Sequence, residues 1–461
     1  MLTIQAPYPI PASSRFWRET PRVAYSSAQQ QLNLTSQNNQ ASSPQESSYA
    51  IKDWFRFAFG KAPVRIIQNA QVLLENGQFA TQNVTTLGDK FYQVSDKLPG
   101  LALWVRKQLG HSIQVTNAQG HLMTPGLIDQ HNHGALGVDL MTASPQEMNS
   151  LMRKLPAYGV TGIAATMVTA PKDDMAQAIQ RVEQAIQTQG PQQTRLLGIH
   201  LEGPFLNKGY NGTHNPKWML EPSLTTMAGL ESPNLRLVSL APELDQNAQL
   251  TKALVSKGIR VLAGHTDASL QQMKQATDAG LSGVTHLYNR MPALHHREPG
   301  VIGAALTLPS LKSEIIADGV HVHPSVLRFT LQSKPQDMIL VTDSMYLAGL
   351  PDGQSGMMAG EKVKCQEGKV YVESKGCDPR TIVLAGSAAI LNQCVQNVVR
   401  WGITNFATAV QMASKNPADF MGLTQVGRIK SNALADFVLW DPKTLKVNQT
   451  YIGGNKVYQR A

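Results

Sequence analysis

The chain has 461 residues, more than one small domain needs and enough for a barrel-sized core beside a second module. Its composition, 42% hydrophobic and 16% charged, is that of an ordinary soluble globular protein. The formal net charge of +9 comes without a run of Lys and Arg and without zinc-finger spacing, so we predict no nucleic-acid partner. A scattered basic surface of this kind would suit an anionic small substrate.

The cysteines and the hydropathy pattern indicate where the protein works. Cys365, Cys377 and Cys394 are odd in number and form no Cys-x-x-Cys pair, which fits a reducing compartment and predicts no disulfide framework. No apolar run approaches the ~18–20 residues of a membrane helix, so no membrane partner is expected. Arg15 and Arg18 lack the hydrophobic region of a secretory signal behind them. We therefore expect a cytoplasmic protein.

The first part of the chain, residues 1–60, is predicted to be a flexible extension. Its segment 26–48 is rich in Gln, Asn and Ser, and it buries too little apolar surface to offset the entropy of ordering it. Aromatic residues at 54–59 form a patch that would anchor the extension.

Short β-like runs then occur at both ends of the remaining chain. They are punctuated by turn residues such as Asn76-Gly77. The runs lie at 64–67, 70–73, 113–115 and 436–440. Together they predict a small β-sandwich domain built from residues 61–123 and 425–461.

The middle of the chain, residues 124–424, alternates strand and helix patterns. Helix-like segments such as 145–158 and 172–188 separate most of the strand-like runs. Those runs lie at 126–128, 160–168, 195–201, 235–240, 259–264, 283–287, 314–317 and 337–342. Eight strands alternating with helices predict an α/β fold with a parallel (β/α)8 TIM-like barrel. A doubly wound open sheet is the alternative, but no Gly-x-Gly-x-x-Gly follows any of these strands.

Metal-ligand side chains follow many of these strands. They are Asp129, His131, His133, His200, Glu202, His265, His286, Asp318, His321 and Asp343. In a barrel, all C-terminal strand ends converge on one mouth, so these side chains would share a site. Zn²⁺, Fe²⁺ and Mn²⁺ bind through neutral imidazole and carboxylate groups. The sequence therefore predicts one or two divalent metal ions at the mouth.

Two subsets of these residues suit a hydrolytic metal site. His131 and His133 lie two apart on a strand continuation, so they point to one side. Glu202, His265 and His286 together supply one carboxylate and two imidazoles, and three protein ligands is the number that a catalytic metal site commonly uses. A metal lowers the pKa of bound water towards ~7, and Asp343 would take the proton and pass it to a leaving group. The alternative for Asp343 is an N-cap after Thr342.

Nine motifs together carry a family resemblance. They are Pro-Gly-Leu-Ile-Asp with His-Asn-His at 125–133, His-Leu-Glu-Gly-Pro-Phe-Leu at 200–206, Gly-Thr-His-Asn-Pro at 212–216, Gly-His-Thr-Asp at 264–267, Thr-His-Leu-Tyr-Asn at 285–289, Arg-Glu-Pro-Gly at 297–300, Ala-Asp-Gly-Val-His at 317–321, Thr-Asp at 342–343 and Leu-Ala-Gly-Ser at 384–387. Over roughly residues 62–460 the chain resembles the N-acetylglucosamine-6-phosphate deacetylases of the amidohydrolase superfamily. The Asp-x-His-x-His start marks only the superfamily, whereas the second, fifth and sixth motifs are much more specific.

The resemblance implies roles for individual residues. Glu202, His265 and His286 correspond to metal ligands, and His131 and His133 correspond to a second metal position that only some members keep.

Further roles follow for the substrate. Asp343 corresponds to the catalytic acid/base, and His214 to a residue that contacts the sugar and polarises the acetamide carbonyl. The phosphate pocket would be formed by Arg297, His321 and the backbone of Asn289 and Arg290. A substrate-contacting loop would comprise Leu384, Ala385 and Gly386. The implied reaction releases acetate and glucosamine 6-phosphate, and the family usually forms homodimers in which part of the phosphate pocket can come from the partner.

Three positions depart from the family pattern. Arg290 stands where members commonly carry Ala, so its side chain either adds a charge contact or crowds the pocket. Thr213, beside His214 in the substrate site, replaces a usual Ala. Tyr346 lies in the segment after Asp343, where family members commonly carry small residues. We consider two roles for Tyr346: it alters the sugar specificity, or it packs as an aromatic residue.

Three rival interpretations remain. Another amidohydrolase type would commonly use a carboxylated Lys, but Glu202 occupies that strand and no strand ends in Lys. A deacetylase acting on another N-acyl sugar phosphate, such as N-acetylgalactosamine 6-phosphate, is not distinguished by the sequence. A barrel that binds sugar phosphate without turnover should have lost Asp343 or a metal ligand, and all are present.

Overall fold

The computed structural model describes residues 51–358, 360–375 and 382–461. Phe55–Ala461 form one compact unit, and Met1–Trp54 are grouped apart from it. The predicted extension lies outside the described residues up to position 50, and so does Cys377. Residues 51–59 of that predicted extension form helix α2 (Ile51–Phe59).

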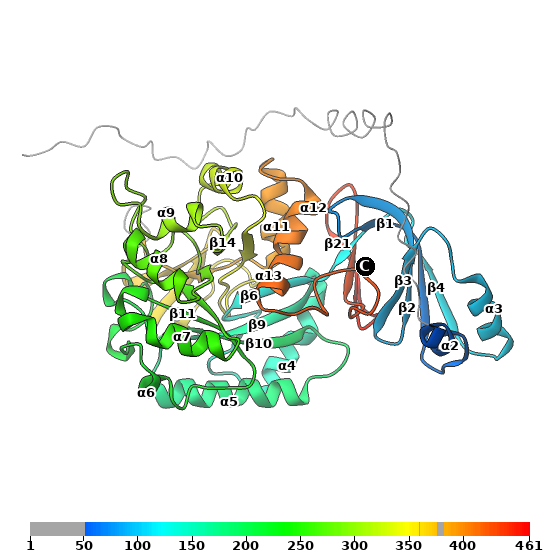
Figure 1. Cartoon of the computed structure of the whole chain (residues 1–461), viewed down its shortest axis with the longest axis horizontal. Coiled ribbons are helices and arrows are strands. Elements are labelled where there is room, and N and C mark those ends of the chain that lie inside the picture. Colours follow the sequence, from blue (N-terminus) through cyan, green and yellow to red (C-terminus); the bar gives the residue numbers. More distant parts are fainter. Residues whose placement is uncertain (1–50, 359, 376–381) are drawn as a thin grey trace, which may run out of the picture. The chain divides into compact units, whose positions relative to one another are not determined.

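Eight parallel strands form the sheet on which the rest of the compact unit is built. In chain order they are β6 (Leu127–Asn132), β9 (Val160–Val168), β10 (Arg195–Glu202), β11 (Leu235–Leu240), β12 (Arg260–Ala263), β13 (Gly283–Val284), β14 (Lys312–Ile316) and β15 (Met338–Val341). Each pairs with its neighbours in this order. Contacts between the end of β6 and the residues just after β15 nearly close the barrel, because the Asp343 N–H donates to the His131 carbonyl at 3.0 Å. The predicted (β/α)8 barrel is confirmed (Figure 1).

Helices follow most of these strands and cover the outside of the barrel (Figure 1). They include α4 (Pro145–Lys154), α5 (Lys172–Thr188), α6 (Leu224–Met227), α7 (Gln249–Ser256), α8 (Leu270–Asp278), α9 (Gly300–Thr307), α10 (Pro324–Ser333), α11 (Leu391–Arg400), α12 (Phe406–Met412) and α13 (Lys415–Phe420). Helix α4 begins at a capping box, in which Ser144 and Glu147 satisfy each other's backbone N–H groups. Helices outside and side chains inside bury both faces of the strands, which explains their nearly continuous apolar sequences.

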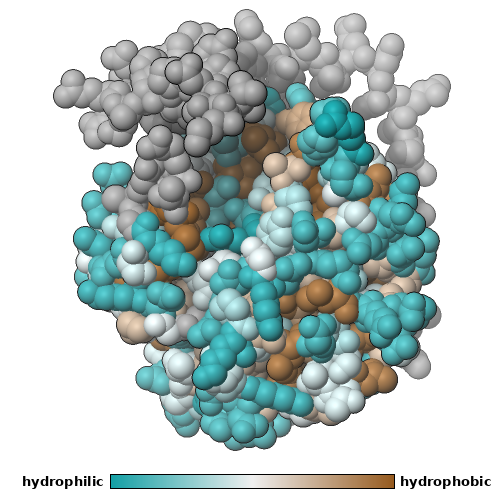
Figure 2. Space-filling model, turned by 90° about the vertical axis from the view of Figure 1, so that its left-hand side faces the viewer, coloured by the Kyte–Doolittle hydropathy of each residue, from teal (hydrophilic) through white to brown (hydrophobic). Residues whose placement is uncertain are grey.

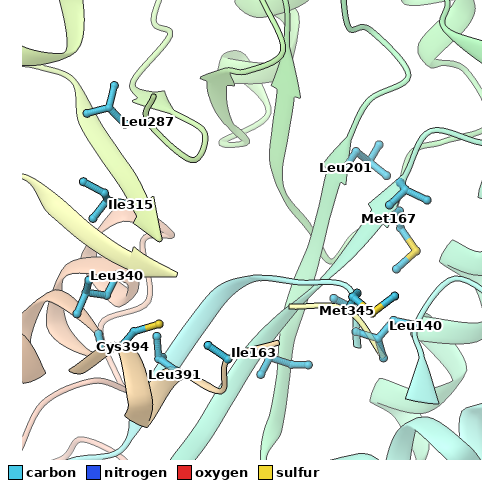
Figure 3. Close-up of a cluster of buried hydrophobic side chains, with 14 of the residues drawn as sticks. Leu140, Ile163, Met167, Leu201, Leu287, Ile315, Leu340, Met345, Leu391 and Cys394 are labelled. Carbon is cyan, nitrogen blue, oxygen red and sulfur yellow. The ribbon is translucent and has the colours of Figure 1, made fainter. Parts of the chain in front are cut away.

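The core between barrel and helices is apolar and closely packed. Figure 3 shows Leu140, Ile163, Met167, Leu201, Leu287, Ile315, Leu340, Met345, Leu391 and Cys394 from this core, each with at most 1% of its surface exposed. Burying one such Leu side chain stabilises the fold by about 1.5–3 kcal/mol. Cys394 and Cys365 are both free thiols in buried positions.

Both ends of the described chain contribute to a second sheet. Its strands are β1 (Val64–Leu73), β2 (Phe79–Leu87), β3 (Lys90–Ser95), β4 (Ile113–Asn117), β5 (Leu122–Pro125), β20 (Phe437–Trp440), β21 (Val447–Ile452) and β22 (Asn455–Gln459). Arg195 on β10 pairs with Asp436 at 2.7 Å and so connects the barrel to this sheet.

Helix α3 (Gly100–Gln108) interrupts the stretch that we expected to be entirely β-like. Its Leu101 and Trp104 are 66% and 60% exposed, so the helix shows little of the apolar periodicity that would have predicted it. Buried Arg106 attaches the helix by donating to the carbonyl oxygens of Phe57 and Gly60, at 2.7 and 2.8 Å.

A small antiparallel sheet follows the last barrel strand and was not predicted. It comprises β16 (Ser355–Met358), β17 (Glu361–Gln366), β18 (Lys369–Val372) and β19 (Leu384–Ser387). A two-stranded ribbon, β7 (Gly134–Ala135) and β8 (Val138–Asp139), follows β6. Both lie at the C-terminal ends of barrel strands, where an active site is built in this fold.

None of the helices in the described ranges is long and apolar enough to cross a bilayer. Hydrophilic and hydrophobic residues are interspersed over the face seen in Figure 2.

Candidate active site

A cavity of about 380 Å³ lies at the C-terminal ends of the barrel strands. Most of the residues predicted for the site line it: His133, Glu202, Thr213, His214, His265, His286, Asn289, Arg290, His321, Asp343, Leu384 and Gly386. His131 and Ala385 are fully buried beside it. The barrel therefore brings together residues that lie up to about 250 positions apart in the sequence.

Glu202, at the end of β10, is the centre of the imidazole cluster. Its Oε1 lies 2.9 Å from Nε2 of His286 and 3.2 Å from Nε2 of His265. Its Oε2 lies 3.1 Å from Nε2 of His133, while Oε1 lies 3.5 Å from Nε2 of His131. One carboxylate thus faces these four imidazoles, with Oε1 towards His265, His286 and His131 and Oε2 towards His133.

This donor set fits a divalent metal. Ligand atoms at the 2.0–2.1 Å bonds of a tetrahedral site lie roughly 3.4 Å apart, close to the separations around Glu202. Nε2 atoms of His265 and His286 are 3.1 Å apart, and those of His131 and His133 are 3.3 Å apart. The set of His131, His133, Glu202 and Asp343 offers ligand atoms that all lie within 4.8 Å of one another. Neutral imidazoles with shared carboxylates are the ligands that Zn²⁺, Fe²⁺ and Mn²⁺ accept.

A second buried carboxylate orients the cluster from behind. Oε2 of Glu314, in the middle of β14, lies 2.9 Å from Nδ1 of His131. Oε1 of Glu314 accepts a hydrogen bond from Nε2 of Gln130 at 2.8 Å. The sequence analysis did not predict Glu314. The available signal was an isolated carboxylate inside an apolar strand, which is rarely buried unless it is paired.

Opposite charges within the cluster stabilise each other's ionised forms. Burial opposes the ionisation of Glu202, but the imidazole of His131 outweighs it and holds the pKa of Glu202 well below its usual value. Asp343 behaves likewise, because His131 and His133 overcome burial and lower its pKa to about 2. Burial disfavours a charge on His133, yet Asp343 and Glu202 raise its pKa to about 9. Without a metal, the cluster therefore holds protons that a metal would displace.

His214 is held in one orientation by the end of β9. The backbone N–H of Thr169 donates to Nδ1 of His214 at 3.2 Å, so the ring proton lies on Nε2. That Nε2 lies 3.3 Å from Oε2 of Glu202. His214 is therefore positioned as a hydrogen-bond donor directly beside the carboxylate.

Two basic side chains, Arg290 and His321, also line the cavity. Arg290 lines it, and among the described residues its side chain has no hydrogen-bond or ion-pair partner within bonding distance. His321 lies nearby with Nδ1 at 2.7 Å from Oδ2 of Asp318, and this carboxylate raises the pKa of His321 although burial opposes it. The cavity thus presents the guanidinium of Arg290 and an imidazole whose protonated form Asp318 favours.

Arg297 is the predicted site residue that the structure does not place in the cavity. It is exposed, and its Nη1 lies 2.9 Å from Nε2 of the neighbouring His296. Within one copy of the described chain, Arg297 does not reach the groups assigned to the phosphate pocket.

Backbone strain is concentrated at the site. His265, His286, Arg290 and Asp343 all have positive φ, at 48°, 29°, 54° and 48°. Such conformations cost of order 1–3 kcal/mol each and persist where the surrounding fold imposes them. The strand ends therefore turn sharply to aim these side chains into the cavity.

Several lining residues were not predicted from the sequence. Tyr210, Tyr288, Met291, Met358 and Ile382 complete the wall. Only Tyr288 lay inside a motif, and no role was assigned to it there. His200, a candidate ligand, instead lies with Nε2 at 2.8 Å from Ser239 Oγ behind the cluster.

With this geometry established, comparison with known proteins identifies the class. The family model described as amidohydrolase family matches residues 122–457. The chain belongs to the amidohydrolase family, whose members are generally dependent on divalent metals.

Relatives within the family are more specific. The chain is 36% identical over 346 residues to an N-acetylgalactosamine-6-phosphate deacetylase of Escherichia coli O157:H7, covering 74% of this chain and 89% of the relative. It is 36% identical over 344 residues to an N-acetylglucosamine-6-phosphate deacetylase of Vibrio furnissii, covering 74% and 84%. The resemblance inferred from the motifs is confirmed.

Solved structures agree. The N-acetylglucosamine-6-phosphate deacetylase of Thermotoga maritima superposes with a TM-score of 0.75 at 28% identity, covering 86% of this chain and all of that one. A mutant of the Mycobacterium smegmatis enzyme, in complex with N-acetyl-D-glucosamine-6-phosphate, gives 0.75 at 26% identity, covering 87% and 100%.

Proposed function

We propose that this protein is a metal-dependent deacetylase that hydrolyses N-acetylglucosamine 6-phosphate to glucosamine 6-phosphate and acetate. The observation that carries the proposal is one cavity that joins the Glu202–imidazole cluster and Asp343 to the cationic side formed by Arg290 and His321. Relatives with this activity, 32–36% identical, support the choice of substrate.

Glu202, His265 and His286 are proposed to hold one divalent metal, and His131 and His133, with Glu202 shared, a second. The ion would be Zn²⁺, Fe²⁺ or Mn²⁺, given the mixed imidazole and carboxylate donors. When bound, such an ion polarises the amide carbonyl and makes water acidic enough to lose a proton near neutral pH.

Asp343 is proposed to be the general base and then the general acid. Its Oδ1 lies 3.2 Å from Nε2 of His133, at the metal-facing edge of the cavity, and its low pKa keeps it ionised and ready to accept a proton from water. As the C–N bond breaks, Asp343 returns this proton to the sugar nitrogen. His214 donates from Nε2 to the carbonyl oxygen as negative charge develops there.

The phosphate group is proposed to bind on the Arg290 side. A guanidinium presents five donors in a fork that matches phosphate, and no described side chain accepts from Arg290 in the protein itself. His321 supplies a second cation, and the backbone N–H groups of Asn289 and Arg290 complete the contact. The sugar is lined between these two ends by Thr213 and by Leu384–Gly386, which the sequence predicted as a loop and which form the start of strand β19 in the structure.

We further propose that the protein is a cytoplasmic homodimer. Exposed Arg297 lies outside the cavity of its own chain, which is consistent with delivery of its guanidinium to a partner's phosphate pocket. The two free, buried thiols among the described residues support a reducing compartment.

The test is acetate release from N-acetylglucosamine 6-phosphate, from its galactosamine epimer and from unphosphorylated N-acetylglucosamine, with the metal content of the same sample determined. Turnover confined to the phosphorylated sugars would support the proposal, and the ratio between the epimers would identify the substrate. Metal content without release of acetate from any of the three would refute it.

A further inference from the structure

A second cavity borders the reacting centre. Its volume is about 490 Å³, and it shares His133 and Met358 with the active-site cavity. Thr169 lines it, and this residue also holds His214 through its backbone N–H. The second cavity therefore lies directly behind two of the residues that surround the proposed scissile bond.

The two cavities occupy different sectors of the barrel mouth. The active-site cavity takes most of its lining from the ends of β10, β12, β13 and β14. The second takes its lining from the loop after β6, the end of β9 with the start of α5, and the segment after β15. In the strand order of the barrel, β6 and β9 lie across the mouth from β12 and β13.

This arrangement matches the two ends of an N-acylated amino sugar phosphate. Arg290 and His321 lie after β13 and β14, so the phosphate and the sugar extend towards that sector. The acyl substituent is attached to the other side of the carbonyl carbon, and it leaves the centre in the opposite direction. That direction leads past His133 into the second cavity.

The lining of the second cavity is suited to a hydrocarbon chain. Buried Met141, Met345 and Met358 contribute to it together with Val168, and exposed Met357 adds a further methionine. Asp139, Asp174 and Arg181 also belong to the lining. Methionine side chains are unbranched and polarizable, and they adapt to ligands of different length. A cavity of several hundred Å³ is of the size that holds a small ligand, far more than the methyl group of an acetamide requires.

We infer that the second cavity is an acyl-binding site and that the protein also removes N-acyl groups longer than acetyl, such as propionyl and butyryl, from amino sugar 6-phosphates. This inference rests on the proposed function. The reaction is the same hydrolysis: water adds its oxygen to the carbonyl carbon, the C–N bond breaks, and the amine receives the proton, releasing the longer carboxylic acid. Tyr346 also lines this cavity, so it faces the acyl side of the site and not the sugar side.

The test compares N-acetyl, N-propionyl and N-butyryl glucosamine 6-phosphate by measuring release of the free amine. An apolar pocket that discriminates against one methylene group changes kcat/KM by about 10–200-fold, so kcat/KM for butyryl within about tenfold of acetyl indicates a site that accepts the chain.

Two variants narrow the cavity and one serves as a control. Ala170→Phe introduces a ring into the cavity, and Gln177→Trp, at an exposed position of α5, narrows its mouth. In each, the ratio of butyryl to acetyl kcat/KM should fall at least about tenfold, the loss expected when an apolar pocket no longer fits its chain. Gln187→Trp lies ten residues, about 15 Å, further along the same helix and should leave this ratio unchanged.

The outcomes separate the inference from the proposed function. Rapid turnover of the acetyl substrate with a loss of more than about a hundredfold for butyryl, the smallest loss expected from a pocket that rejects both additional methylene groups, would overturn the inference alone. An unchanged ratio in a folded Gln177→Trp protein would do the same. Absence of turnover with every acyl group would overturn the proposed function, and the acyl site with it.

Discussion

Glu314 and His131 form a buried pair in which the carboxylate oxygen lies 2.9 Å from Nδ1 of the ring. The pair leaves Nε2 of His131 directed at Glu202 and Asp343. A carboxylate behind a metal-binding imidazole fixes the ring orientation and increases its basicity.

Glu314→Gln is therefore expected to weaken metal binding by about 10–100-fold, the usual effect of removing such a partner. The amide keeps the shape of the carboxylate but loses its charge. Metal affinity is measured by titrating the metal-free protein with Zn²⁺ in the presence of a chelating indicator. Glu231→Gln, at an exposed position paired with Lys257, is the matched control. Unchanged affinity in Glu314→Gln would mean that Glu314 serves only the packing of the barrel.

Asp343→Asn is expected to lower kcat by about 10²–10⁴-fold, the range that a general acid–base contributes. The amide occupies the same space but can neither accept the proton of water nor return it to the amine. Because the residue is assigned to the proton transfers, KM should change much less than kcat. Metal content is measured in the same preparation, and wild-type turnover in a fully metal-loaded variant would exclude the acid–base role.

Arg290→Ala is expected to raise KM for N-acetylglucosamine 6-phosphate by about 10-fold or more, since a charge-assisted hydrogen bond is worth about 1.5–3 kcal/mol. Slow hydrolysis of the unphosphorylated sugar should be unaffected, because it lacks the group that Arg290 binds. Inorganic phosphate provides a second measurement, as its inhibition constant should rise in parallel.

Arg297→Ala tests whether a second guanidinium, besides that of Arg290, contributes to phosphate binding. If Arg297 acts from a partner subunit, its removal raises KM in the same way, and the effect disappears where the protein is diluted to monomers. A KM that is indifferent to Arg290 and sensitive to Arg297 would show that the guanidinium of Arg290 does not bind phosphate.

The barrel was predictable because each of its strands is covered on both faces. The runs at 160–168 and 235–240 coincide with β9 and β11, since burial on both sides leaves mostly apolar residues in each strand. The antiparallel sheet β16–β19 is different. Its strand β17 reads Glu-Lys-Val-Lys-Cys-Gln, with only Val363 and Cys365 buried, so too few apolar residues marked it.

Within the site, the sequence predicted what lies at strand ends and missed what lies inside strands. His265 and His286 follow β12 and β13 at the barrel mouth, where a polar residue after a strand indicates an active-site position. Glu314 lies in the middle of β14 and becomes significant only when His131 is placed beside it. Arg297 lies outside the cavity of its own chain, and no pattern in the sequence indicated this.

His321 provides a test by pH. Burial disfavours its cation, but Asp318 outweighs burial and raises the pKa of His321 above 6.5. The contribution of the charged ring to phosphate binding is therefore complete below the usual histidine pKa and is lost as pH rises through the elevated value. We therefore expect the contribution of His321 to KM for the phosphorylated sugar to be constant below about pH 6.5, and KM to rise at higher pH.

Asp318→Asn should move that rise to lower pH, because the neutral amide no longer holds the proton on His321. The substrate phosphate itself titrates near pH 6, but it does so equally with both proteins, so the difference between the two profiles reports the imidazole alone. Asp278→Asn, an exposed carboxylate at the end of α8, controls for the change in net charge. Superimposable KM profiles for wild type and Asp318→Asn would show that His321 is not charged when phosphate binds. A displaced profile would place the cation of His321 in the phosphate pocket and identify Asp318 as the residue that maintains it.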